Sequence, residues 1–330
     1  MFKRNFAVSI IRVMSMLAIV AYHCMCYNAG IWVRYSCSNV NENINTVAKL
    51  LVTTALPMFF FISGYVYALN FKERNKYGEF LSFVKNKCIR LIIPTISFTI
   101  VYLIFFPREY TIVEMLSGVG HLWFLPTLFV CFLLIYPFSN ILLREVNSVT
   151  GGGENMLVIM ILTWLSANSN KFVEFPVAYA VSFYFVYMVI GMMSYHFIKS
   201  FFYIKASKVI LSIMAMAFVL AHFIISKYDG NMFSIADILC LSILCVLLLG
   251  FLTLKHPKEN SSLRFLDKHS MRIYLIHQPV IMAVYEYSDF EEKYLSPHPY
   301  WYIPTLFILV CAVSMILSVV CEKLRMYPII

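Results

Sequence analysis

Long apolar runs recur along the whole chain, and short polar segments separate them. About twenty consecutive apolar residues suffice for a helix to cross the hydrocarbon core of a bilayer. The runs therefore predict an all-α fold, a polytopic membrane bundle of about ten transmembrane helices. The predicted spans are residues 6–27, 46–70, 88–106, 121–141, 155–168, 177–198, 207–226, 234–254, 271–287 and 301–321. The fifth span is the shortest of the ten.

Composition supports a membrane protein. The 330 residues are 61% hydrophobic and 13% charged, whereas soluble domains are about 45–50% apolar and about 25% charged. The net charge of +9 does not indicate nucleic-acid binding, because no soluble basic segment carries it. No loop is long enough for a separate domain, so one transmembrane domain is expected over residues 1–330. The first apolar run lacks a small-residue cleavage site and is expected to remain as a helix.

The distribution of Lys and Arg predicts the orientation. With ten spans and a cytoplasmic N-terminus, 19 Lys and Arg residues fall in inner segments and 5 fall in outer loops. Cytoplasmic segments of membrane proteins carry this excess of positive charge. Both termini are therefore expected in the cytoplasm.

Arg12 and His23 lie in the first apolar run and form its most informative pair. Eleven residues turn a helix by about 1100°, so both side chains are expected on nearly one face. They lie about 16 Å apart along the axis, with Arg12 nearer the cytoplasm. Each also has a simpler interpretation, because an arginine can extend to the inner interface and an interfacial histidine can bond a neighbouring carbonyl.

Counting depth along the ten spans places the polar residues in two layers. The inner layer is Arg12, Ser63, Lys87, Arg90 and His277, and the outer layer is His23, His121 and Trp123. Fixed cations near the cytoplasm suit a phosphate-bearing ligand, and a histidine suits proton transfer near neutral pH. Each residue also has a simpler explanation. Lys87 and Arg90 could be ordinary cations of an inner loop, and Ser63 and His277 could serve helix packing. His121 and Trp123 could belong to an aromatic belt at the membrane interface.

Four segments in this order resemble the acyltransferase 3 family of integral-membrane O-acyltransferases. They are Arg12 with His23; Met58-Phe59-Phe60-Phe61-Ile62-Ser63-Gly64-Tyr65; Gly120-His121-Leu122-Trp123-Phe124-Leu125; and Ser270-Met271-Arg272-Ile273-Tyr274-Leu275-Ile276-His277-Gln278-Pro279. The resemblance implies ten core helices, a bacterial plasma membrane location, and transfer of an acyl group, usually acetyl, from acetyl-CoA to a sugar hydroxyl.

The resemblance also implies roles for particular residues. His23 is expected to be the catalytic histidine, and Arg12, Lys87 and Arg90 are expected to bind the phosphates of a cytoplasmic acyl-CoA. The acceptor is expected to be a cell-surface glycan or a lipid-linked sugar, with a small molecule as the alternative, and His121 and Trp123 are expected on its side. Ser63 and His277 are expected to support the site.

Two positions depart from the family pattern. Ser9 stands where many members have Asp, and Lys87 stands where many have Arg. Lysine keeps the charge but lacks the bidentate fork of arginine, so donor binding is expected to depend more on Arg90.

Two other classes of function compete with an acyltransferase. A transporter with an intramembrane Arg–His pair would require membrane carboxylates and two related halves, but Asp237 and Glu286 lie near span ends and no internal repeat is visible. A structural subunit would leave Arg12 and His23 without a role. The nine cysteines show no metal-type pairing, so no metal site is expected. The donor implied by the resemblance, acetyl-CoA, is expected as a co-substrate and not as a permanently bound cofactor.

Overall fold

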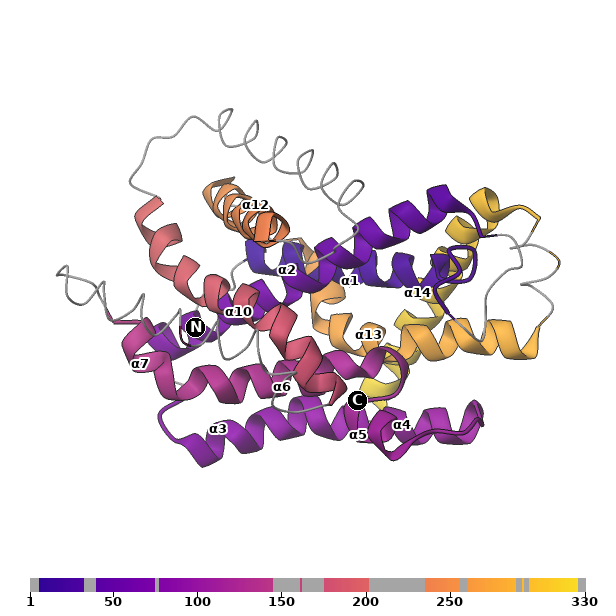
Figure 1. Cartoon of the computed structure of the whole chain (residues 1–330), viewed down its shortest axis with the longest axis horizontal. Helices are drawn as coiled ribbons and strands as arrows, with labels where there is room; N and C mark the ends of the chain where they lie inside the picture. Colours follow the sequence, from indigo (N-terminus) through magenta and orange to yellow (C-terminus); the bar gives the residue numbers. More distant parts are fainter. Residues whose placement is uncertain are drawn as a thin grey trace. The chain divides into compact units, whose positions relative to one another are not determined.

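The computed structural model describes residues 6–32, 40–74, 77–144, 161, 175–201, 235–255, 260–288, 293 and 297–325. Within these ranges the regular elements are helical and no strand occurs, which confirms the all-α class (Figure 1). The elements are α1 (Phe6–Met25), α2 (Glu42–Arg74), α3 (Phe80–Lys87), η1 (Cys88–Ile92), α4 (Ile93–Phe105), α5 (Ile112–Ser117), η2 (Gly120–Trp123), α6 (Phe124–Ile135), η3 (Tyr136–Phe138), α7 (Ser139–Leu142), α10 (Pro176–Phe201), α12 (Ile235–Lys255), α13 (Ser261–Tyr287) and α14 (Pro299–Lys323).

Six described segments are long and apolar enough to cross a membrane, so the protein is a polytopic helical membrane protein. They are Phe6–Met25, Glu42–Arg74, Phe80–Phe105, Gly120–Leu142, Pro176–His196 and Pro299–Lys323. Each overlaps one of the predicted spans. Two further predicted spans, 155–168 apart from Ile161 and 207–226, lie outside the described residues. The count of ten and the orientation of the termini therefore stay predictions.

Helix α13 differs most from its predicted span. It begins at Ser261, ten residues before the predicted start, and the side chain of Asn260 caps it by accepting from the backbone N–H of Ser262 at 2.9 Å. The prediction began this span next to Arg272, because a charged residue was expected at the membrane surface. In the structure Arg272 is buried and its guanidinium donates to Glu322 at 3.0 Å, so that charge marks a contact between helices.

The chain divides into two compact units. The first comprises Met1–Val8, Pro57–Ile96 and Tyr110–Lys258, and the second comprises Ser9–Leu56, Ser97–Glu109 and Glu259–Ile330. The first unit contains α6, α10 and α12, and the second contains the paired helices α13 and α14. The expectation of a single domain over residues 1–330 stays a prediction.

In the first unit, two glycines bring α2 and α10 into close contact. A Cβ atom added at Gly64 would lie 1.9 Å from the carbonyl oxygen of Met188, and one added at Gly191 would lie 1.9 Å from that of Phe61. Small residues allow membrane helices to approach in this way. The Ser63–Gly64 segment therefore has a packing role through its glycine.

Candidate active site

His23 and Arg12 contact the same neighbouring helix, α13. His23 Nδ1 lies 2.8 Å from His277 Nε2, and the Arg12 guanidinium donates to Asp267 at 2.8 Å. The contacts are eleven residues apart on α1 and ten apart on α13, so the two helices run parallel over about 15 Å. The predicted single face of Arg12 and His23 is confirmed.

The hydrogen bonds of His277 determine which ring nitrogens carry protons. Its Nδ1 lies 2.6 Å from the carbonyl oxygen of Tyr274 and 3.2 Å from that of Ile273. Because carbonyl oxygens only accept, Nδ1 carries the proton, and Nε2 of the neutral His277 ring holds a lone pair. Nε2 of His277 therefore accepts from Nδ1–H of His23. In the neutral His23 ring, the lone pair is then on Nε2.

Aromatic rings surround His23. The ring centroids of Tyr22 and Trp32 lie 4.8 Å and 5.9 Å from that of His23, and Trp32 contacts Tyr285 with centroids 6.0 Å apart. His23 itself is buried. A buried polar pair in such surroundings interacts more strongly than it would in water.

Asp267 is the residue that the sequence did not reveal. Its side chain is fully buried, and it accepts from Ser9 Oγ and from the Arg12 guanidinium, each at 2.8 Å. The Arg12 side chain keeps 32% of its surface exposed, and a guanidinium has five N–H donors. Asp267 thus orients Arg12, about a third of whose side-chain surface stays accessible. In the sequence, the neighbours Lys268 and His269 made this stretch look like a solvated loop.

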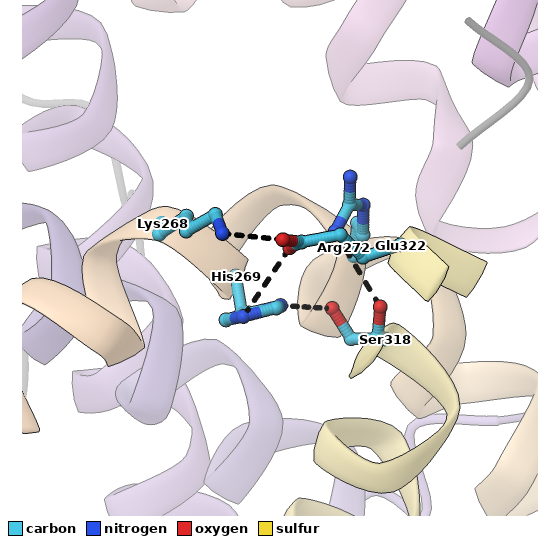
Figure 2. Close-up of polar contacts among 5 residues, drawn as sticks. All are labelled: Lys268, His269, Arg272, Ser318 and Glu322. Carbon is cyan, nitrogen blue, oxygen red and sulfur yellow. Dashed lines mark hydrogen bonds and ion pairs between the residues drawn. The ribbon is translucent and has the colours of Figure 1, made fainter. Parts of the chain in front are cut away.

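An ion-pair cluster on the second unit fixes α13 against α14 (Figure 2). Glu322 of α14 accepts from Lys268 and from Arg272, and His269 Nδ1 lies 2.7 Å from Ser318 Oγ. On α13, Lys268 and His269 of this Glu322 cluster directly follow Asp267. The same part of α13 is thereby bonded to α1 and to α14, which sets the position of His277 further along the helix.

The layer predicted for His277 was wrong. His277 was expected beside Arg12 near the cytoplasm, but it contacts His23, and Asp267 takes the place opposite Arg12. The physical reason is the early start of α13 at Ser261, which adds about three helical turns before His277.

The other predicted donor residues, Lys87 and Arg90, lie in the first unit. The Lys87 ammonium sits 3.2 Å from the ring centroid of Phe132, with Tyr77 and Phe83 at 5.6 Å and 5.5 Å. Lys87 is therefore engaged by an aromatic cage. Arg90 is exposed and belongs to the π-helical turn η1, an irregularity that often occurs at functional sites.

The predicted acceptor-side residues also lie in the first unit. His121 is buried in the short helix η2, and the Trp123 ring stacks on Tyr184 with centroids 5.8 Å apart. Gly118 and Gly120 have φ values of 94° and 59° and make the turn that begins this segment. Ser63, the remaining predicted residue of this unit, is half-buried on α2.

The predicted site residues thus fall into two groups. Arg12, His23 and His277 are brought together with Asp267 on the second unit, and Ser63, Lys87, Arg90, His121 and Trp123 belong to the first unit. Within the described ranges, no group of three or more His, Cys, Asp or Glu side chains could hold a metal ion. The chemistry that the second-unit group can perform is proton transfer at His23, with the fixed cation Arg12 about 15 Å away along the helices.

Comparison with known proteins identifies the family. The acyltransferase 3 family model, described as an acyltransferase domain, matches residues 5–323. Neither the curated proteins nor the solved structures give a match. Since the family model covers nearly the whole chain and the chain is a polytopic helical membrane protein, it belongs to the acyltransferase 3 family and is a membrane acyltransferase.

Proposed function

We propose that this enzyme moves an acyl group, most simply acetyl, from cytoplasmic acyl-CoA to a hydroxyl of a cell-surface glycan or a lipid-linked sugar. The observation that carries the proposal is the His23–His277 pair, whose hydrogen bonds assign the lone pair to His23 Nε2. A buried imidazole held in one tautomer by a second group is the arrangement that general-base catalysis uses.

In the proposed reaction, His23 Nε2 takes the proton of the acceptor hydroxyl while the hydroxyl oxygen attacks the thioester carbonyl carbon. The new C–O bond forms, the C–S bond breaks, and the departing thiolate takes the proton back from the His23 imidazolium. His277 accepts a stronger hydrogen bond from His23 while that ring is charged. A second route lets the same nitrogen attack the thioester first and carry the acyl group to the acceptor. A trapped acyl-histidine would distinguish the two routes.

The donor is proposed to bind through cations. Arg12, held by Asp267, and the exposed Arg90 offer guanidinium groups to the phosphates of acyl-CoA, and Lys87 adds charge nearby in sequence. Acetyl-CoA acts as a co-substrate, and no cofactor is permanently bound.

We also propose how the chain is arranged in the membrane. Ten helices with both termini in the cytoplasm would bring acyl-CoA from the inside and present His23, His121 and Trp123 toward the outside, where the acceptor binds. Ser63 supports the site from α2. The excess of Lys and Arg in the inner segments supports this orientation, and the location proposed is a bacterial plasma membrane.

Mass spectrometry of surface glycans tests the proposed function. Cells that express the protein should carry an acetyl-sized mass increment that is absent without the gene and absent with His23→Ala. Ile308→Ala is the matched control, because Ile308 is an exposed apolar residue of α14 that makes no part of the site. Normal glycan acylation by a well-inserted His23→Ala protein would rule out the catalytic role of His23.

A further inference from the structure

A polar pocket of about 540 Å³ lies past the C-terminal end of α1, within the second unit. Three segments that are distant in sequence form it. Asn28 comes from the turn after α1, Asn41 precedes α2, and His298, Tyr300 and Trp301 come from the start of α14.

Hydrogen bonds hold the wall of this pocket in place. Asn41 Oδ1 accepts from the backbone N–H groups of Asn43 and Ile44 at 3.1 Å and 3.2 Å, which caps α2. Asn41 Nδ2 donates to the Tyr300 hydroxyl at 3.1 Å, and the Asn41 backbone N–H donates to the Asn28 carbonyl at 2.9 Å. The three segments are therefore joined through Asn41, and the pocket is formed before any ligand binds.

The chemistry of the pocket suits an uncharged sugar. Trp301 is 81% exposed and Tyr300 is 61% exposed, so both offer ring surface to a ligand. Asn41 keeps a second Nδ2–H beyond its bond to Tyr300, and His298 also lines the pocket, so polar groups for a sugar hydroxyl are present. The described lining contains no Asp, Glu, Lys or Arg. Apart from His298, no side chain of the described lining could pair with a charged ligand, whereas a sugar ring can use the exposed aromatic faces and the polar groups.

The pocket lies close to His23 along the chain. Asn28 follows His23 by five residues, and the Ala29 N–H still donates to the Met25 carbonyl at 2.9 Å, so the chain continues as a helical turn. Five residues of helix advance about 7.5 Å. The wall of the pocket at Asn28 is therefore displaced from His23 by little more than one helical turn.

We propose that the pocket is an acceptor subsite that binds a neighbouring neutral sugar unit, so that the enzyme prefers an extended oligosaccharide to a single sugar. This inference rests on the proposed acyl transfer to a glycan. Trp301 contributes to chain-length specificity by stacking on that sugar unit.

Calorimetric binding to the full chain in lipid nanodiscs tests the subsite. The probes are monosaccharides and linear hexasaccharides of glucose, galactose and N-acetylglucosamine, in the absence of acyl-CoA. At least one hexasaccharide should bind more tightly than its monosaccharide. Trp301→Ala should weaken that hexasaccharide about tenfold, and Tyr300→Phe, which removes the hydroxyl bonded to Asn41, should weaken it less. The control Ile308→Ala, an exposed position on the same helix, should bind as the wild type does.

Two results would overturn the subsite: equal affinity for hexasaccharide and monosaccharide, or a hexasaccharide preference that survives Trp301→Ala. The second result would make Trp301 an interfacial anchor. Because the binding assay needs no donor, it separates this inference from the proposed function. Trp301-dependent binding without any acyl transfer would defeat the proposed function alone, and His23-dependent transfer with Trp301-independent binding would defeat the subsite alone.

Discussion

At the scale of single residues, His23 is the proposed general base and His277 orients it. His277 donates its Nδ1–H to a backbone carbonyl. In the neutral ring Nε2 then has only a lone pair, so it accepts from His23. His277 is thus a positioning residue that acts through His23. The sequence supplied both histidines as candidates, but it could not pair them, because their contact depends on the register between two helices that are 254 positions apart along the chain.

Replacing His277 tests this positioning role. His277→Gln places an amide oxygen near the position of Nε2 and can still accept from His23, whereas His277→Leu cannot. We expect His277→Leu to lower kcat about 10- to 150-fold, because a hydrogen bond of about 1.5–3 kcal/mol to the charged His23 ring is lost, and His277→Gln to lower it less. Steady-state transfer from labelled acetyl-CoA measures both. Equal losses in the two variants, with equal folding, would reduce His277 to a packing residue.

Asp267 is predicted to act on Arg12. Removing the carboxylate leaves the Ser9 hydroxyl and the Arg12 guanidinium without their shared acceptor. Asp267→Ala and Arg12→Ala should each weaken acyl-CoA binding, and the double variant should be little worse than either. A coupling free energy of about 0.5–2 kcal/mol is expected, at the low end because Arg12 is one-third exposed. Additive losses in acyl-CoA affinity would show that the two residues act independently.

The two cations of the first unit should differ in effect. Arg90→Ala should weaken acyl-CoA binding about 10- to 150-fold if a charge-assisted hydrogen bond of about 1.5–3 kcal/mol is lost. Lys87→Met should have a smaller effect on affinity, because the Lys87 ammonium faces the rings of Phe132, Tyr77 and Phe83. Titration of purified variants with acyl-CoA measures both. A larger loss for Lys87→Met than for Arg90→Ala would move the donor phosphates to Lys87.

At the scale of helices, the apolar runs predicted the positions of most of the described long helices. For α13, the charge of Arg272 led to a predicted start that was ten residues too late. The runs worked because a span needs a minimum length of apolar residues, which is a local property. The start of α13 could not be found this way, since Arg272 is neutralised by Glu322 from another helix. The π-helical turn at Arg90 was missed because no composition signal marks it.

The contact between α2 and α10 gives a prediction at this scale. Gly64→Ala would place a methyl group against the Met188 carbonyl, so the helices must separate. We expect a loss of about 1–3 kcal/mol, seen as a lower thermal unfolding midpoint in detergent. Gly250→Ala is the matched control, because a Cβ at Gly250 of α12 meets nothing within 4 Å. It should be neutral or stabilising by up to about 1 kcal/mol. Equal midpoints for the two variants would contradict the close packing.

At the scale of the whole molecule, the sequence predicted the membrane class, and the family model agrees with the motif resemblance across residues 5–323. Class follows from composition, which is averaged over the chain and therefore robust. The candidate site was predictable only in part. Arg12 and His23 were recognisable because ionisable groups are rare in membrane helices, whereas Asp267 and the pocket at Asn41 depend on contacts between distant segments.

The central claim is that His23 catalyses the transfer of an acyl group from a cytoplasmic donor to a glycan bound on the other face. The most direct measurement uses sealed vesicles of known orientation, with labelled acetyl-CoA on the cytoplasmic side and glycan acceptor on the outer side. The account predicts labelled glycan with wild-type protein and with Ile308→Ala, and none with His23→Ala. Transfer that occurs only when both substrates share the cytoplasmic side, or that persists in His23→Ala, would contradict it.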